Sequence, residues 1–197
     1  MSNYRLPEED RCAPPHDFHI PHDTKAVMTC GTSSGLTLPV DSGRRKCDCP
    51  AAFVAGTVAI DSRGLNCPTV KIDFSTMINY QVESREGEFS IRLIFQLSRA
   101  CDNGPKIPLG TWIYEKEVDI DRRRRVLGPP VNAAQAIPNG ISRSEVDIDL
   151  KEAFSFTWCE CVNCPGCCHY VVEVIDIDTD NIRCLSLTNV GINALAI

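Results

Sequence analysis

Residues 88–97, EFSIRLIFQL, alternate apolar and polar side chains with a period of two. In an extended chain the apolar members face one side, and Ser90, Arg92 and Gln96 face the other. This alternation predicts an antiparallel strand with one face in a hydrophobic core and the other in solvent. The apolar members are Phe89, Ile91, Leu93, Phe95 and Leu97.

The same alternation recurs along most of the chain, between turn signals such as Asn103-Gly104-Pro105 and Asn139-Gly140. No stretch shows the spacing of an amphipathic helix. We therefore expect eight to ten strands and an all-β fold, an antiparallel β-sandwich that is jelly-roll-like or, as the alternative, immunoglobulin-like. Further strands are expected at residues 26–30, 53–61, 70–74, 78–82, 111–120, 145–150, 154–158, 169–178 and 184–195.

Residues 1–25 differ from the rest in that they carry four prolines and several acids and have no apolar period. This composition predicts an extended, flexible N-terminal arm that precedes a β-sandwich domain over residues 26–197. The arm carries one cysteine, Cys12, which has no core of its own to staple. An arm of this kind can reach a neighbouring copy and form a covalent link there.

Charge and composition exclude several classes of function. The net charge is −6 and the pI is near 5.2, which argues against nucleic acid as a partner. No apolar run approaches the roughly 18 residues that a membrane span needs, and the N-terminus has no apolar signal-peptide core. Because no phosphate-binding loop or nucleophile elbow occurs either, we expect no enzyme activity and no cofactor.

Cysteine is the most unusual feature of the composition, with twelve in 197 residues. Residues 159–169, CECVNCPGCCH, contain five of them and a histidine, in what we expect to be a hairpin tip between Trp158 and His169. Such a content is typical of oxidising compartments, although nothing in the chain directs secretion. Either the thiols stay reduced and bind metal, or the protein is made in a cytosol and oxidised afterwards.

Metal binding is the alternative interpretation of this loop. Cys161, Cys164 and Cys167 have the C-x2-C-x2-C spacing of iron–sulfur loops, and with His169 they could hold zinc. The fourth cysteine of a ferredoxin loop and the second knuckle of a zinc ribbon are both missing. A thioredoxin-like role for Cys164-Pro165-Gly166-Cys167 is disfavoured, because the residues that follow predict a strand where that chemistry needs a helix.

Disulfides explain the wide spread of the cysteines better, because metal ligands cluster whereas disulfide frameworks spread through a chain. The sequence alone does not determine their connectivity. The candidates for bonds between subunits are Cys12, Cys30, Cys47 and Cys49. A loop cluster comprises Cys159, Cys161, Cys164, Cys167 and Cys168, and the remaining candidates are Cys67, Cys101 and Cys184.

The segments KCDCPAAFVAGTVAIDS, NCPTVKIDFSTMI and FSFTWCECVNCPGCCHYVVEV are similar to an uncharacterised cysteine-rich domain family of anaerobic spore formers. The layout also resembles the subunits of bacterial endospore appendages, which are small jelly-rolls with a cysteine-bearing N-terminal arm. Those subunits lack signal peptides and stack into fibres through strand augmentation and disulfides. The resemblance implies synthesis in a mother-cell cytosol and oxidation after that cell lyses.

We therefore expect a structural protein, a self-assembling subunit of an extracellular fibre at the spore surface. Its partner would be itself, as a homopolymer, with a spore-coat or exosporium protein as a possible anchor, and with neither nucleic acid nor membrane. The alternatives are a zinc or iron–sulfur module that uses residues 159–169, and a monomeric domain with internal disulfides and a ligand-binding face.

Overall fold

The strand predicted from residues 88–97 is present and lies in the middle of a sheet. β6 (Phe89–Cys101) pairs with β9 (Cys167–Asp180) on one side and with β7 (Ile107–Val118) on the other. All five of its predicted inward side chains are buried, and Ile91, Leu93 and Phe95 are 0% exposed. The alternation therefore assigned the two faces of this strand correctly.

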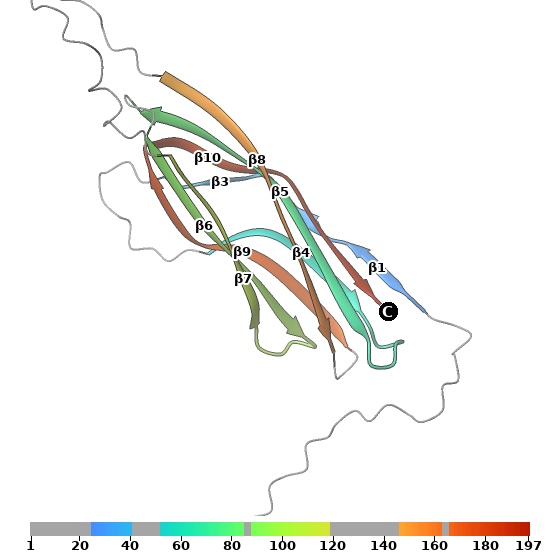
Figure 1. Cartoon of the computed structure of the whole chain (residues 1–197). Helices are drawn as coiled ribbons and strands as arrows, with labels where there is room; N and C mark the ends of the chain where they lie inside the picture. Colours follow the sequence, from blue (N-terminus) through green and yellow to red (C-terminus); the bar gives the residue numbers. More distant parts are fainter. Residues whose placement is uncertain (1–24, 41–51, 85–87, 119–145, 163–165) are drawn as a thin grey trace, which may run out of the picture.

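The computed structural model describes residues 25–40, 52–84, 88–118, 146–162 and 166–197. This part of the chain is all-β and forms ten strands in two antiparallel sheets (Figure 1). The predicted arm and Cys12, Cys47, Cys49 and Cys164 lie outside the described residues. The remaining strands are β1 (Val27–Cys30), β2 (Thr32–Ser33), β3 (Leu36–Leu38), β4 (Phe53–Asp61), β5 (Thr69–Ser84), β8 (Val146–Cys161) and β10 (Ile182–Ala196).

The strand order is that of a jelly roll, because the chain forms one long hairpin that is rolled up. From its tip outward, β6 pairs with β7, β5 with β8, β4 with β9 and β1 with β10. Rolling then joins β10 to β5 and β9 to β6. The result is sheet A, in the order β1-β10-β5-β8 with β3 also on β10, and sheet B, in the order β2-β4-β9-β6-β7. This is the two-Greek-key arrangement of jelly-roll domains.

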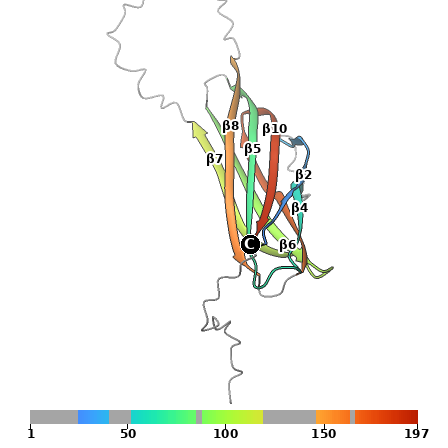
Figure 2. The same cartoon turned by 90° about the vertical axis from the view of Figure 1, so that its right-hand side faces the viewer.

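The hydrophobic core lies between the two sheets, and in the view of Figure 2 strands β8, β5 and β10 of sheet A lie in front of the strands of sheet B. Each strand contributes the side chains of its inward face, and alternate residues face solvent. The largest fully buried side chains are Phe74, Phe95, Tyr170, Ile60, Ile72, Ile78, Ile91, Leu93, Leu97, Leu185, Leu187 and Ile192.

Three expectations about strands are corrected. The predicted strands at residues 70–74 and 78–82 are one strand, β5, and those at 145–150 and 154–158 are one strand, β8. The predicted hairpin tip between Trp158 and His169 is wrong, because β8 pairs with β5 in sheet A whereas β9 pairs with β4 and β6 in sheet B. The cysteine-rich segment therefore crosses from one sheet to the other.

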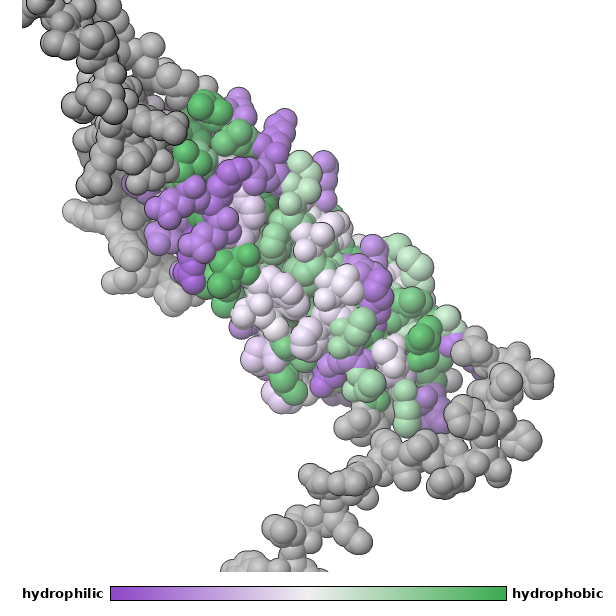
Figure 3. Space-filling model, in the orientation of Figure 1, coloured by the Kyte–Doolittle hydropathy of each residue, from purple (hydrophilic) through white to green (hydrophobic). Residues whose placement is uncertain are grey.

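Polar residues gather at one end of the sandwich. In the space-filling view they are densest toward the upper left, where β5 ends and β8 begins (Figures 1 and 3). Most of the described cysteines lie at the opposite end, where β6 and β8 end and β9 begins.

Candidate functional site

The cysteine-rich end of the sandwich contains a disulfide between Cys101, at the end of β6, and Cys168, at the start of β9. The two residues lie directly opposite each other in the antiparallel ladder, with their Cα atoms 4.0 Å apart. Cys168 is 1% exposed, so the bond lies at the inner face of sheet B. It joins Cys168, a member of the predicted loop cluster, to Cys101, which was not predicted to belong to that cluster.

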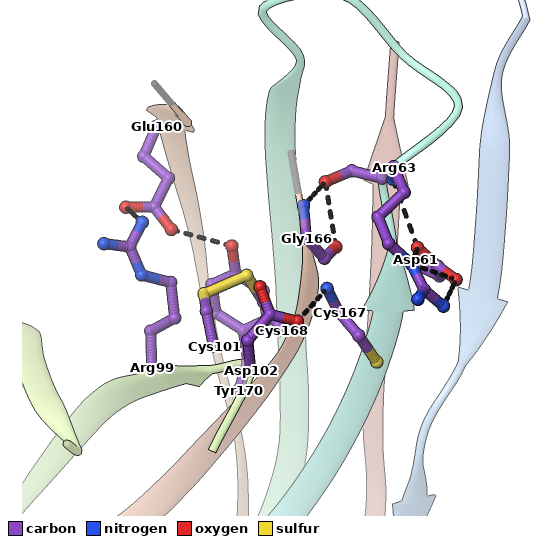
Figure 4. The surroundings of a disulfide bond; sticks show 11 residues. Asp61, Arg63, Arg99, Cys101, Asp102, Glu160, Gly166, Cys167, Cys168 and Tyr170 are labelled. Carbon is purple, nitrogen blue, oxygen red and sulfur yellow. Dashed lines mark hydrogen bonds and ion pairs between the residues drawn. A yellow bond between two sulfur atoms is a disulfide. The ribbon is translucent and has the colours of Figure 1, made fainter. Parts of the chain in front are cut away.

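Hydrogen bonds hold the chain on both sides of this disulfide (Figure 4). The backbone N–H of Cys167 donates to the Asp102 carboxylate at 3.1 Å, and the Asp102 N–H donates to the Cys167 carbonyl at 3.0 Å. The Ser62 N–H donates to the Gly166 carbonyl at 2.9 Å, and the Gly166 N–H donates to the hydroxyl oxygen of the buried Ser62 at 3.2 Å. A Cβ on Gly166 would lie 2.4 Å from a carboxylate oxygen of Asp102, so a side chain at this position would displace the carboxylate that accepts from the Cys167 N–H.

A carboxylate between the sheets ties the end of β8 to sheet B. Glu160 accepts a 2.8 Å hydrogen bond from the Arg99 guanidinium and a 2.7 Å hydrogen bond from the Tyr170 hydroxyl. Burial, and then the hydrogen bond to Glu160, raise the pKa of Tyr170 above its usual range. The phenol therefore stays protonated and acts as a donor.

A second carboxylate, Glu152, ties the other end of β8 to sheet B. It accepts hydrogen bonds from Tyr114 at 2.9 Å and from Tyr80 at 3.1 Å, and it forms an ion pair with Lys116. The hydrogen bond from Lys116 is the main cause that lowers the pKa of Glu152 below its usual range. β8 is thus held at two points. Side chains of β6 and β9 bind Glu160 near its end, and side chains of β5 and β7 bind Glu152 nearer its start.

Aromatic rings fill the space between these two carboxylates. Trp112 of β7 stacks on Phe156 of β8 with ring centroids 3.8 Å apart and an interplanar angle of 7°. Trp158 and Phe154 flank this pair on β8, and Tyr114 meets Phe154 edge-on. The edge strands of the two sheets therefore lie on the same side of the sandwich and are packed together through aromatic side chains.

The backbone of β8 presents hydrogen-bonding groups to solvent. β8 pairs with β5 over sixteen consecutive residues with no register shift, and no other described strand pairs with it. The Val162 N–H donates to the Pro68 carbonyl at 2.9 Å, which makes that pair a hydrogen-bonded one. Because such pairs alternate along an antiparallel ladder, even-numbered residues of β8 bond to β5 and odd-numbered ones direct their N–H and C=O to the open edge.

Six of the described cysteines are free thiols. Cys159 and Cys161 are exposed on the outer face of β8, and Cys30 is exposed on the outer face of β1, at the same end of sheet A. Cys184 is exposed on that face of β10 at the other end of the sheet. The other two are Cys67, in the turn before β5, and Cys167, on the outer face of sheet B.

The described members of the predicted loop cluster are divided between the two sheets. Cys159 and Cys161 belong to sheet A, whereas Cys167, Cys168 and His169 belong to sheet B. Within the described ranges, no three cysteine, histidine or acidic side chains lie close enough together to hold a metal ion. The alternative ligand set also includes Cys164, which is outside those ranges, but its other members do not converge.

Glu152 and Glu160 join β8 to sheet B, and the sequence analysis did not identify either of them. A signal for both was present. They share the alternation phase of the apolar residues Phe154, Phe156 and Trp158, so each is an acid at a position that should face the core. A carboxylate in such a position needs buried donors, and the tyrosines and basic side chains described above supply them.

A family model described as Domain of unknown function (DUF4489) matches residues 24–197, so the chain belongs to this family. No curated protein matches the chain. No solved structure matches it either. None of the described residues forms a helix long and apolar enough to cross a membrane.

Proposed function

We propose that this member of the DUF4489 family is a structural, self-assembling subunit of an extracellular fibre at the spore surface. Copies add to one another by β-strand augmentation, and disulfides between subunits then lock the contacts. The chain has no catalytic role and needs no cofactor. It is made in a mother-cell cytosol, its main partner is itself, and a spore-coat or exosporium protein anchors the fibre.

The open edge of β8 is the observation that carries this proposal. A long, regular edge strand is a template for another strand, and soluble proteins usually block such edges with proline, charged side chains, bulges or a covering segment. The middle of β8, residues 153–158, carries no charge. β8 contains no proline or glycine and no register shift along its ladder with β5. β7, the edge strand of sheet B, contains Pro108 and Gly110 and has a register shift against β6.

Two further features support assembly into a fibre. Cys159 and Cys161 are exposed on β8 itself, so a strand that pairs there comes within reach of two thiols. A contact between the β8 edge and a different surface of the next copy is heterologous, and heterologous contacts propagate into filaments. The jelly-roll strand order is consistent with this role, as is the resemblance of the sequence layout to endospore-appendage subunits.

The test is a proline at Ala153, an exposed residue in the middle of β8. As an odd-numbered residue, Ala153 directs its N–H to the open edge, so the substitution removes a donor for a neighbour and no bond to β5. Ala153→Ser is the matched control, because it keeps the donor. Negative-stain electron microscopy of the oxidised protein should show filaments for the wild type and Ala153→Ser and only particles for Ala153→Pro.

Two results would count against the proposal. One is a wild-type protein that stays monomeric by size-exclusion chromatography after oxidation at high concentration. The other is an Ala153→Pro variant that forms filaments of normal length. Retention of the Cys101–Cys168 disulfide in the variant, measured by mass spectrometry, shows that the fold has survived the substitution.

A further inference from the structure

We propose that consecutive copies are joined by a disulfide between Cys30 of one copy and Cys159 of the next, formed where β1 pairs with β8 in a continuous antiparallel sheet. The inference rests on the proposed assembly by strand addition. The proposed function does not specify which strand pairs with β8 or which two thiols join the copies, and this inference specifies both.

Strand direction selects sheet A for this contact. Its path β1-β10-β5-β8 has three antiparallel steps, so β1 and β8 run in opposite directions. A copy placed beside β8 without being turned over therefore continues the antiparallel alternation. Sheet B has four antiparallel steps from β2 to β7, so the same operation would place two parallel strands side by side.

The backbone groups of the two edges match. The Gly31 N–H donates to the Ile192 carbonyl at 2.8 Å, so odd-numbered residues of β1 bond to β10. Met28 and Cys30 consequently direct their N–H and C=O groups away from β10, to the outer edge of the sheet. On β8 the odd-numbered residues do the same. A ladder between the two edges must therefore pair Cys30 with an odd-numbered residue of β8.

The same rule places the thiols on one face. Cys30 is on the outer face of sheet A, and so are the odd-numbered residues Cys159 and Cys161 of β8. Cys30 pairs with Asn193, Asn193 with Asp73, and Asp73 with Thr157, so Cys30 lies level with Thr157 across sheet A. If the next copy is shifted by two residues along the strand, about 7 Å, Cys30 of one copy lies directly opposite Cys159 of the next.

This register also accounts for an exposed apolar side chain. With Cys30 opposite Cys159, Met28 of the same copy lies opposite Cys161 of its neighbour. Met28 is 70% exposed, more than any other large hydrophobic side chain among the described residues. Pairing would cover it with the edge of the next copy, as expected for a residue at an interface.

Cys30 and Cys159 cannot bond within one chain. Three strand spacings separate β1 from β8 across sheet A, which is about 14 Å. A disulfide needs Cα atoms within about 7 Å, and directly opposite residues in a hydrogen-bonded antiparallel pair are about 5.5 Å apart. Cys101 and Cys168 already show that this chain forms a disulfide between directly opposite residues of adjacent antiparallel strands.

The bond forms by two-electron oxidation. Two thiols lose two protons and two electrons and form one S–S bond, and molecular oxygen accepts these to become hydrogen peroxide. A dissolved disulfide such as oxidised glutathione can replace oxygen, through a mixed disulfide that releases two reduced thiols. Both routes require exposed thiols, and Cys30 and Cys159 are both exposed.

Mass spectrometry of the assembled wild type tests the linkage. Trypsin cleaves after Lys25, Arg44, Lys151 and Arg183, so Cys30 is the only cysteine in peptide 26–44, and Cys159 lies in peptide 152–183. A non-reduced digest of air-oxidised protein should contain these two peptides joined, together with peptide 100–106, which the Cys101–Cys168 bond holds on peptide 152–183. When ¹⁵N-labelled and unlabelled protein are mixed before assembly, the joined pair should include mixed-label species, because the bond lies between chains.

Complementation then tests the two residues. Cys30→Ser and Cys159→Ser should each lose the joined peptide pair, whereas the controls Cys161→Ser and Cys184→Ser should keep it. Mixing Cys30→Ser with Cys159→Ser should restore the pair only between the two variants, from Cys30 of one to Cys159 of the other. Loss of the joined pair in Cys161→Ser with retention in Cys159→Ser would overturn the proposed register.

The outcomes separate this inference from the proposed function. Filaments that form normally and contain no bond between peptides 26–44 and 152–183 would overturn the Cys30–Cys159 link and leave assembly by strand addition intact. Failure of the wild type to assemble would remove both. Filaments of Cys30→Ser that form but dissociate on dilution, while wild-type filaments persist, would support the linkage as a covalent lock.

Discussion

The Tyr170 hydroxyl donates a 2.7 Å hydrogen bond to the Glu160 carboxylate, so a fully buried residue of sheet B holds the edge strand of sheet A from across the core. Arg99 completes this contact, and the Glu160 side chain is only 12% exposed. Removing the carboxylate leaves a buried phenol and a mostly buried guanidinium without their acceptor.

We predict that Glu160→Ala lowers the free energy of unfolding by about 2–4 kcal/mol. Asp176→Ala is the matched control, because Asp176 pairs with Arg92 on the surface, where such pairs contribute at most about 1 kcal/mol. Urea unfolding followed by tryptophan fluorescence measures both. Equal losses in the two variants would contradict a special role for the contact between the sheets.

Acid should weaken the fold through Glu152. Lys116, Tyr114 and Tyr80 hold the pKa of this carboxyl below its value of 4.5 in the unfolded chain. The unfolded state therefore takes up a proton at a pH where the folded state does not. The stability contributed by Glu152 is complete above about pH 5 and is lost as the pH falls through the folded pKa.

The variant Glu152→Gln should show a smaller loss of unfolding free energy between about pH 5 and pH 3 than the wild type. Glu117→Gln, an exposed acid on the same strand as Lys116, is the control and should follow the wild type. Urea midpoints across a pH series provide the measurement. A steeper pH dependence in Glu152→Gln would mean that the sign of this effect is wrong.

The Cys101–Cys168 disulfide closes a loop between residues 67 positions apart. In the chain-entropy description a loop of this length stabilises the fold by about 4 kcal/mol. Cys101→Ser with Cys168→Ser should therefore lower the thermal midpoint markedly, whereas Cys184→Ser should change stability by less than about 0.5 kcal/mol. Calorimetry under oxidising conditions compares the two, and a double variant as stable as the wild type would exclude this contribution.

The stacked pair Trp112–Phe156 should be the most sensitive part of the packing between the two edge strands. Phe156 is 7% exposed, and truncation of a buried phenylalanine costs about 3–5 kcal/mol. Phe156→Ala should fall in this range, and Phe156→Leu, which keeps most of the volume, should lose less. Denaturant titrations rank the variants, and equal stability of the two would mean that the ring contributes little.

Period-two alternation was sufficient to predict β6 and its buried face, because a strand has only two side-chain directions. It failed where a polar residue faces the core. Thr76 is 3% exposed, and its hydroxyl donates to the Thr188 carbonyl. Because this polar residue faces the core, it interrupts the apolar alternation, and β5 was predicted as two strands. Glu152 interrupted β8 in the same way, because its tyrosine and lysine donors come from distant segments.

The alternation along one strand does not show which other strand pairs with it or in which register. The partner of Cys168 is Cys101, and their opposition follows from the register of β6 against β9, which only the folded sheet defines. The hairpin predicted for the cysteine-rich segment failed for the same reason. Both flanking strands were recognised, but their assignment to different sheets depends on the rolling of the whole chain.

The ladder between Val27 and Ala196 makes the first and last strands neighbours, and β10 lies in the interior of sheet A. A chain that has been synthesised only as far as β9 lacks the strand that joins β1 to β5. Sheet A, with the two edges proposed for assembly, can therefore close only after β10 has been made. Contacts of such long sequence separation also slow folding, so under the proposed assembly each newly made copy would pass through a period in which its two sheet edges are not yet available for pairing.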